Sequence, residues 1–302
     1  MKFDIQQVND KEKWGELLLI SNGEIELQIP LTIGPRITSF RFIDGENIFY
    51  EAPDAKKHFG SNEWFPYGGH RLWHAPEQNP RSYYPDNQPV KIEETENTLA
   101  VIQDTEETTG IQKTIRIHLD TNGNNIRIDH VLKNNGLWEL EFAGWALSML
   151  GKNGKAIIPL PEKIPFPKAL LPNHALILWP YTNLSDPRLI PSKEFLTISQ
   201  IPEELPFKIG VMCEKNWIGY FRDTNFFVKK FQFVKNMDYP DFGSCVEVFT
   251  NGEMLELETI SPLQKIKPGE ELIHREDWEL WRTDGVPANE MEIDSVIQKY
   301  LI

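Results

Sequence analysis

The sequence predicts an all-β protein, a large antiparallel β-sandwich with a short C-terminal helix. Short segments in which apolar and polar residues alternate with a period of two dominate its 302 residues. Asn-Gly and Asp-Gly pairs, which favour tight turns, separate several of these segments. Helical periodicity is scarce, and we find no internal repeat, low-complexity tract or linker. We therefore expect a single domain over residues 1–302.

The first half of the chain contains two predicted hairpins. Asn22-Gly23 predicts a tight turn between strands at 16–20 and 24–29. A second hairpin is expected to pair 111–119 with 126–132, because isoleucine and leucine alternate with polar residues in both runs. Two further strands are expected, at residues 37–43 and 99–103.

The second half continues as strands and ends in a helix. The strands are expected at residues 142–150, 175–179, 207–212, 217–221, 227–234, 244–250, 254–260 and 272–281. Between the first two, the five prolines in 159–172 predict a long covering loop. Near the C-terminus, Ile293, Val296 and Ile297 recur at helical spacing, and Asn289 is a suitable N-cap, so we expect a helix over 289–300.

Charge and composition limit the classes of partner. The net charge is −14 and the pI is about 5.0, which disfavours nucleic acid and anionic membrane surfaces. The two cysteines, Cys213 and Cys245, have no metal-binding spacing, and no apolar run is long enough for a signal peptide or a membrane span. We expect a cytoplasmic protein with no cofactor.

One stretch, residues 67–77, combines the residue types that a sugar site needs. The ring of Trp73 can cover the apolar C–H face of a pyranose, while Arg71 offers a rigid fork of donors and Glu77 a carboxylate for hydroxyl pairs. We interpret these three as substrate-binding residues. The alternative is a polar loop that packs on its own aromatic residues.

The same stretch contains His70 and His74, which we take as candidate catalytic groups. Their His-x-x-x-His spacing binds zinc when it lies on a helix. Glycines before this pair and Pro76 after it leave little room for a helix, and no stronger zinc pattern is present. We therefore expect no metal site.

A second group of candidates lies on the hairpin formed by the strands at 244–250 and 254–260. Glu256 and Glu258 point to one face of their strand, and Glu247 is a further acidic residue inside the partner strand. Burial on a partly apolar face raises the pKa of a carboxyl group, which suits a general base near neutral pH. The alternative is a solvated face with ordinary surface glutamates.

Two weaker candidates complete the set. Asp186 lies in a turn that follows the aromatic run around Trp179, where it can form one wall of a cleft. His130 lies on the apolar face of its strand, which is more typical of a core histidine than of a catalyst.

The sequence resembles the galactose mutarotase (aldose 1-epimerase) superfamily. The resemblance rests on Leu-Glu-Thr at 257–259, Lys-Pro-Gly-Glu at 267–270, Gly-Pro-Arg-Ile at 34–37, Gly-Gly-His-Arg at 68–71 and Asn-Asn-Gly at 134–136. Each pattern is weak alone, but their order matches the family across residues 23–281. The resemblance implies a β-supersandwich with a carbohydrate cleft. Within the family, the sequence resembles a bacterial branch rather than a true galactose mutarotase.

The resemblance also implies a mechanism. In the family, a glutamate takes the proton from the anomeric hydroxyl while a histidine protonates the ring oxygen; carried over, Glu258 is the base and Arg71 a hydroxyl clamp. The family's acid histidine is missing here, because residues 144–148 read Gly-Trp-Ala-Leu-Ser. His70, His74 or His130 can replace it from elsewhere.

Three functions remain open at this stage. The first is an aldose epimerase or mutarotase that uses Glu258 with a relocated histidine. The second is a non-catalytic sugar-binding protein, in which Trp73, Trp145 and Trp179 serve binding. The third is a lyase or hydrolase acting on an oligosaccharide, which needs a second acid–base group such as Glu247, Glu77 or His74 across the cleft. In each case the partner is a small-molecule carbohydrate.

Overall fold

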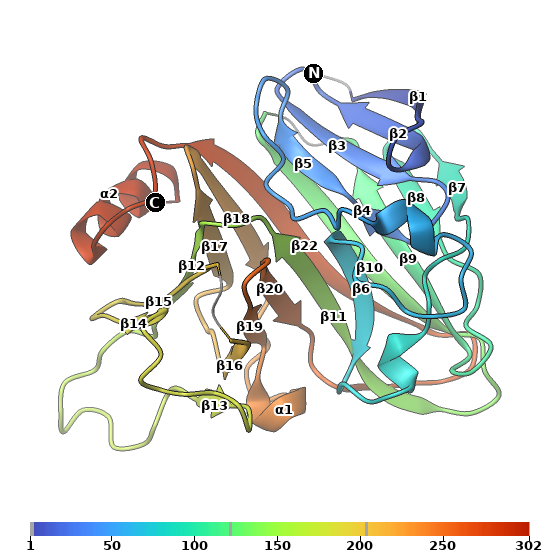
Figure 1. The fold of residues 1–302 in the computed structure, drawn as a ribbon. Coiled ribbons are helices and arrows are strands. Elements are labelled where there is room, and N and C mark those ends of the chain that lie inside the picture. The colour runs from blue at the N-terminus through green and yellow to red at the C-terminus, as the bar shows by residue number, and fades with distance from the viewer. Residues whose placement is uncertain (1–2, 121–122, 203–204, 302) are drawn as a thin grey trace.

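The computed structural model describes residues 3–120, 123–202 and 205–301, and arranges almost all of its regular structure as β-strands in three antiparallel sheets (Figure 1). This confirms the predicted fold class. The first sheet, at the top right of Figure 1, has four strands in the order β1 (Asp4–Asp10), β2 (Gly15–Ser21), β3 (Ile25–Pro30) and β5 (Ser39–Phe42).

The second sheet has ten strands. Their order is β14 (Leu189–Pro191), β15 (Phe195–Ser199), β12 (Lys155–Pro159), β17 (Trp217–Arg222), β18 (Asn225–Phe231), β22 (Glu271–Arg282), β10 (Asn125–Asn134), β9 (Ile111–His118), β8 (Thr98–Ile102) and β7 (Lys91–Glu94). Alternation in β9 buries every second residue, as a strand with one face on the core requires.

The third sheet has eight strands and carries the candidate site. Their order is β13 (Leu176–Leu178), β16 (Phe207–Val211), β19 (Val246–Thr250), β20 (Leu255–Ile260), β11 (Leu140–Leu150), β6 (Gly69–Ala75) and β4 (Arg36–Ile37), with β21 (Gln264–Ile266) paired to one end of β11. Its inner face packs on β10 and β22 of the ten-stranded sheet, and one apolar core runs through all three sheets.

Helices are few. α2 (Glu290–Tyr300) begins where the sequence predicts, with the Asn289 side chain accepting a hydrogen bond from the backbone N–H of Glu292. Its buried residues Ile293 and Ile297 pack beside the β17–β18 hairpin. The short turn α1 (Pro240–Gly243) and the 3₁₀ turns at Ala55–His58 and Arg81–Tyr83 are the remaining ones in the described ranges. None of the described helices combines the length and apolar character that a membrane crossing needs.

The predicted hairpins form, but one predicted strand is divided and one strand was not predicted. The strand expected at 37–43 is divided at Thr38, whose N–H bonds to Gln28: β4 before it pairs with β6, and β5 after it pairs with β3 in another sheet. The stretch around Arg71, for which no strand was predicted, forms β6 between β11 and β4. The chain turns into it through Gly68 and Gly69, both at positive φ, so these glycines mark the start of a strand.

Candidate functional site

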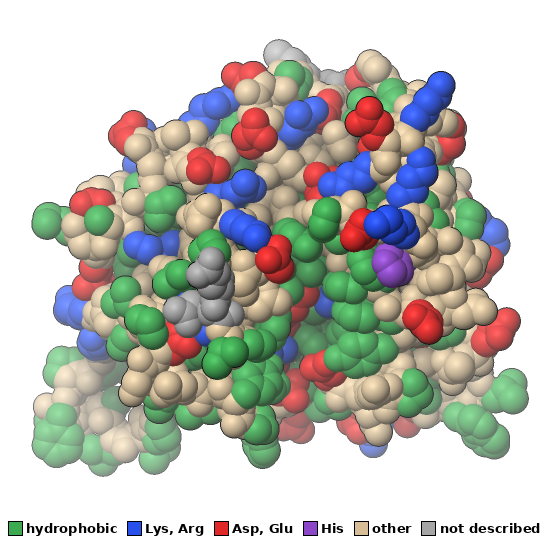
Figure 2. Space-filling view, in the orientation of Figure 1, with side chains coloured by type: hydrophobic (Ala, Val, Ile, Leu, Met, Phe, Trp, Pro, Cys, Tyr) green, Lys and Arg blue, Asp and Glu red, His purple; other side chains and the backbone are tan. Residues whose placement is uncertain are grey.

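A cleft of about 270 Å³ lies on the outer face of the eight-stranded sheet. Its lining residues fall into three groups: aromatic (Trp64, Trp73, Tyr83, Trp145, Tyr181, Phe249), apolar (Pro66, Leu147, Met149, Met254) and charged (Arg71, Glu77, Lys208, Glu256). Figure 2 shows this face, where apolar side chains gather over the lower part of the sheet around a recess that also holds acidic and basic groups.

Strand alternation explains why these side chains meet. On β6, Arg71 and Trp73 point outward, and on β11 their register partners are Leu147 and Trp145. On β20, Glu256 shares the outward face with Glu258, whose register partner on β11 is again Leu147. The indoles of Trp73 and Trp145 stand edge to face, with ring centroids 5.3 Å apart.

The arginine predicted to clamp hydroxyls is fixed on the cleft wall. Arg71 Nη2 donates to Glu256 Oε1 at 3.1 Å, and the guanidinium carbon lies 4.3 Å from the centre of the Trp73 ring. Stacking and the ion pair hold the side chain in one orientation. Its Nε is buried without a partner, so the fork keeps a donor to spare.

Beside this pair, a lysine bridges two buried carboxylates. Lys208 Nζ lies 2.6 Å from Glu247 Oε2 and 3.4 Å from Glu258 Oε2. The Trp145 indole N–H donates to the same Glu258 oxygen at 2.8 Å, while Glu258 Oε1 is buried with no partner. The ammonium also lies 4.8 Å from the centre of the Trp179 ring.

Burial shifts the proton affinities of this group. It raises the pKa of Glu258 above that of an ordinary carboxyl, and that of Glu247 further still. Burial alone would lower the pKa of Lys208, but the two carboxylates outweigh it and raise that pKa. The cluster therefore keeps its lysine charged, while its two carboxyls bind a proton more readily than exposed carboxyls do.

The two candidate histidines of β6 do not reach this cleft. Residues 70 and 74 have the opposite parity from Arg71, so both side chains point between the sheets. His70 Nδ1 lies 2.8 Å from Ser148 Oγ, and His74 is buried with both ring nitrogens unpartnered. Burial lowers the pKa of both rings. This placement gives no support to either as the acid that acts on a sugar in the cleft.

His130 lies in the same interior network. Its Nε2 is 2.6 Å from His70 Nε2, and its Nδ1 donates to the carbonyl of His274. When His130 is neutral, its proton is on Nδ1, so its Nε2 accepts a hydrogen bond. The donor to that nitrogen is then His70 Nε2, which leaves His70 Nδ1 to accept from the Ser148 hydroxyl. His130 is a hydrogen-bonded core histidine.

This network also contains the one group of three potential metal ligands in the described ranges: His70, His130 and Glu276. Two nitrogens bound to one tetrahedral zinc stand about 3.3 Å apart, given bonds of about 2.0–2.1 Å. The two Nε2 atoms are closer, and Glu276 already accepts from Lys229 Nζ at 2.7 Å and from the Trp278 indole at 2.7 Å. The geometry fits a satisfied polar core better than a metal site.

The remaining candidates have mixed placements. Glu77 lies at the exposed rim of the cleft and accepts a hydrogen bond from the Tyr83 hydroxyl. Trp179 packs against Lys208. Asp186 forms a two-bond pair with Arg188, at 2.9 and 2.7 Å, and does not line the cleft.

The sequence reasoning missed several residues that shape the cleft. Lys208 was the most informative of them, because it is a lone charged residue between Phe207 and Ile209 in an otherwise apolar strand. Such a position signals a buried charge that needs a partner. Trp64 comes from a loop and Tyr83 from a short 3₁₀ turn, where no periodicity in the sequence shows which way a side chain points.

No protein-family model matches the chain, and no curated protein matches it. Solved structures do. A "putative aldose 1-epimerase" from Klebsiella pneumoniae aligns over 99% of this chain and 87% of its own, with 11% identity and a TM-score of 0.61. A galactose mutarotase-like protein from Lactobacillus casei aligns over 88% and 100%, with 9% identity and a TM-score of 0.53. A galactose mutarotase related enzyme from Lactobacillus acidophilus aligns over 90% and 99%, with 11% identity and a TM-score of 0.51.

At identities this low, the likeness concerns the fold. The alignments cover 88% and 99% of this chain, so they include all three of its antiparallel sheets. The protein has the galactose mutarotase-like β-sandwich fold.

Proposed function

We propose that the protein binds a carbohydrate in the cleft on the eight-stranded sheet. The observation that carries this proposal is the meeting of an aromatic wall with a fixed Arg71–Glu256 pair on one small surface. An aromatic ring covers the apolar face of a sugar, and the charged pair offers a donor and an acceptor to neighbouring hydroxyls. The volume of about 270 Å³ is slightly smaller than that of most ligand pockets, which suits a single ring.

The charges of the cleft favour a neutral sugar. Its two cations, Arg71 and Lys208, are both paired with carboxylates, and three glutamates (Glu247, Glu256, Glu258) surround them. A phosphate or a uronic acid would meet a surplus of negative charge without an uncommitted cation in this lining. We therefore expect neutral aldoses to bind more tightly than their phosphorylated or oxidised forms.

A second candidate function is interconversion of sugar anomers with Glu258 as general base. The observation in its favour is a desolvated carboxyl with raised pKa and one unpartnered oxygen, on the strand that the resemblance identified. No histidine lines the cleft in the described ranges. Lys208 is the cation beside Glu258, but its raised pKa makes it a poor acid at neutral pH. We therefore place binding first.

The test is NMR with a panel of neutral aldoses, recording saturation transfer and anomer exchange in the same samples. Arg71→Lys keeps a charge opposite Glu256 but loses the planar fork, so sugar affinity is expected to fall about tenfold, the value of one charge-assisted hydrogen bond. Arg41→Lys is the matched control, because Arg41 forms a comparable pair with Glu26 on the N-terminal sheet. No saturation transfer from any sugar would refute the proposal.

The same samples decide the second candidate. Exchange above background that disappears in Glu258→Gln, with saturation transfer retained, would establish a catalytic role for Glu258. Saturation transfer with no exchange in the wild-type protein would leave binding alone.

A further inference from the structure

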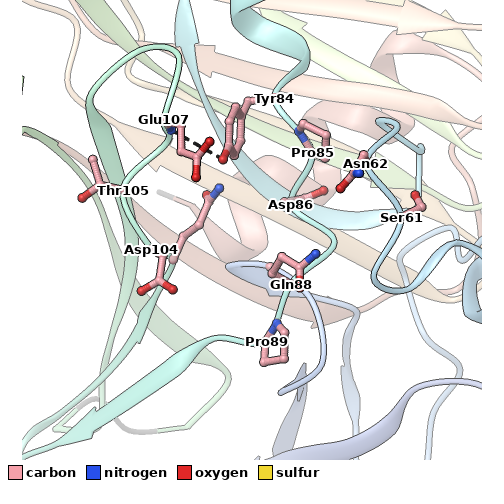
Figure 3. A pocket seen from close by; sticks show the side chains of 12 residues that line it. Ser61, Asn62, Tyr84, Pro85, Asp86, Gln88, Pro89, Asp104, Thr105 and Glu107 are labelled. Atoms are coloured by element: carbon pink, nitrogen blue, oxygen red, sulfur yellow. Dashed lines mark hydrogen bonds between the residues drawn. The ribbon is translucent and has the colours of Figure 1, made fainter.

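A second hollow, of about 420 Å³, lies on the other side of the loops that wall the cleft. Figure 3 shows it between the loop that carries Asp104, Thr105 and Glu107 and the segment from Tyr84 to Pro89, with Ser61 and Asn62 on the far side. The Glu107 backbone N–H donates to the Tyr84 hydroxyl across it, at 3.5 Å.

Two buried acceptors in this hollow have no donor. Asp86 is 9% exposed and Gln103 is 6% exposed, and both line the hollow. Asp86 Oδ2 accepts from the buried Arg36 Nη2 at 2.5 Å, but its Oδ1 has no partner, and neither has Gln103 Oε1. Buried polar atoms are nearly always hydrogen-bonded in proteins, so these two atoms are acceptors that the protein itself leaves unpaired beside the hollow.

The rest of the lining specifies the chemistry of those donors. It contains the carboxylates of Asp86, Asp104 and Glu107 and no lysine or arginine, which disfavours an anionic ligand. The three carboxylates are not among the groups of the described residues whose ligand atoms converge on a metal position. Hydroxyl groups are the donors that fit, and the Tyr84 ring supplies a flat apolar surface beside them.

The hollow and the cleft share their walls. In one loop, Ser61 and Asn62 line the hollow, while Trp64 lines the cleft. In another, Tyr84 lines the hollow and the preceding Tyr83 lines the cleft. The two sites are therefore separated by the same two short segments of chain.

We propose that this hollow is a second sugar subsite, so that the protein's ligand is a neutral oligosaccharide with one ring in the cleft and a hydroxyl-bearing ring on Asp86 and Gln103. This inference rests on the proposed function, because it takes the cleft as the first subsite.

The experiment compares affinities for single sugars and short glycans by titration calorimetry. The probes are glucose, galactose and mannose, together with maltose, maltotriose, cellobiose, cellotriose and mannobiose. At least one di- or trisaccharide is expected to bind about ten times more tightly than its monosaccharide. Gln103→Leu removes an unpaired acceptor with little change in shape, so it is expected to leave stability unchanged or raised and to abolish that gain. Gln7→Leu, at an exposed glutamine of β1, is the control.

The outcomes separate the two proposals. Equal affinity for every chain length, or a gain that survives both Gln103→Leu and Tyr84→Ala, overturns the second subsite, while single sugars that still depend on Arg71 uphold the cleft. If no probe of any length binds, both proposals fall.

Discussion

Lys208 neutralises part of the negative charge beside the cleft. It is the cation nearest to both Glu247 and Glu258, and all three side chains are almost fully buried. A buried carboxylate without a counterion lowers the free energy of unfolding far more than a paired one does. Sugar hydroxyls would meet this cluster beside the Arg71–Glu256 pair, so the charge of one lysine affects both stability and recognition.

We expect Lys208→Met to destabilise the protein by about 3–5 kcal/mol at pH 7, because it leaves two buried carboxyls without a counterion. The loss should shrink as the pH falls towards 5, since those carboxyls, whose pKa values burial raises, then take up protons. Urea unfolding at the two pH values measures this. Lys152→Met, which breaks a surface pair with Glu253, should change little, and equal losses in the two variants would contradict the prediction.

Phe242 illustrates backbone strain at a single residue. It has φ 60° and ψ 26°, follows Asp241 at φ 50°, and its side chain is 95% exposed. Left-handed backbone costs most non-glycine residues about 1–2 kcal/mol, but less for asparagine. Phe242→Asn should therefore raise the free energy of unfolding by about 1 kcal/mol, whereas β-branched Phe242→Val should lower it. Denaturant melts of the two variants test this, and shifts of the same sign would disprove it.

Sequence reasoning reached part of the candidate site at this scale. Glu256 and Trp145 line the cleft, and each lies in a strand that the sequence predicts, whereas Arg71 and Trp73 also line it but were selected by residue type alone. Lys208 was not identified, because its partners come from strands about 40 and 50 residues away in sequence, and spacing along one chain segment does not reveal such contacts.

Strand β6 carries the cleft residues Arg71 and Trp73, and the chain turns into this strand at Gly68 and Gly69. Gly69 can be compared with Gly60, which lies outside the strand and has a similar φ. Gly69 has φ 70°, and a Cβ there would lie 2.3 Å from the carbonyl oxygen of Ile37. Gly60 has φ 71°, but a Cβ there would meet no atom within 4 Å. The two positions thus share the same backbone strain and differ in steric clash.

We expect Gly60→Ala to cost about 1–2 kcal/mol from the left-handed backbone alone. Gly69→Ala should cost distinctly more, because strands β4 and β6 must separate to make room. The difference between the free energies of unfolding of the two alanine variants, from chemical denaturation, measures the cost of the steric clash at Gly69. If the two alanine variants were equally stable, the close approach of Gly69 to Ile37 would be absent in solution.

Elements with strong local signals were predictable, and elements defined by distant partners were not. The hairpin of β2 and β3 follows from Asn22-Gly23, and α2 follows from its cap and its spacing. Strand β6 was not predicted, because glycine before it and proline after it are typical of turns and loops, and its pairing with β4 and β11 comes from distant parts of the chain. With that strand unrecognised, the inward direction of His70 and His74 could not be inferred.

The interior between the sheets holds several histidines in their neutral form. Burial lowers the pKa values of His70, His74 and His130, and that of His274 to about 3. A base with a lowered pKa stabilises the folded state above its unfolded pKa of about 6.5, and this contribution is lost as the pH falls below that value. Acid therefore weakens the molecule as a whole.

We expect the free energy of unfolding to fall between pH 6.5 and pH 5, with each such histidine adding up to about 1.4 kcal/mol per pH unit. Glu247 acts in the opposite direction, because its raised pKa makes the folded state bind a proton first. Glu247→Gln should therefore steepen the decline. Urea titrations at several pH values measure both slopes, and a flat wild-type profile over this range would refute the neutral histidine network.

The order of strands has a last consequence, for self-association. The ten-stranded sheet ends on one side at β14, three residues closed by Pro191, and on the other at β7, whose Lys91, Glu93 and Glu94 are exposed. Proline lacks a ladder donor, and charged side chains repel an incoming strand. The eight-stranded sheet likewise ends in β13 and β4, of three and two residues. The edges of these two sheets thus offer little template for amyloid-like stacking.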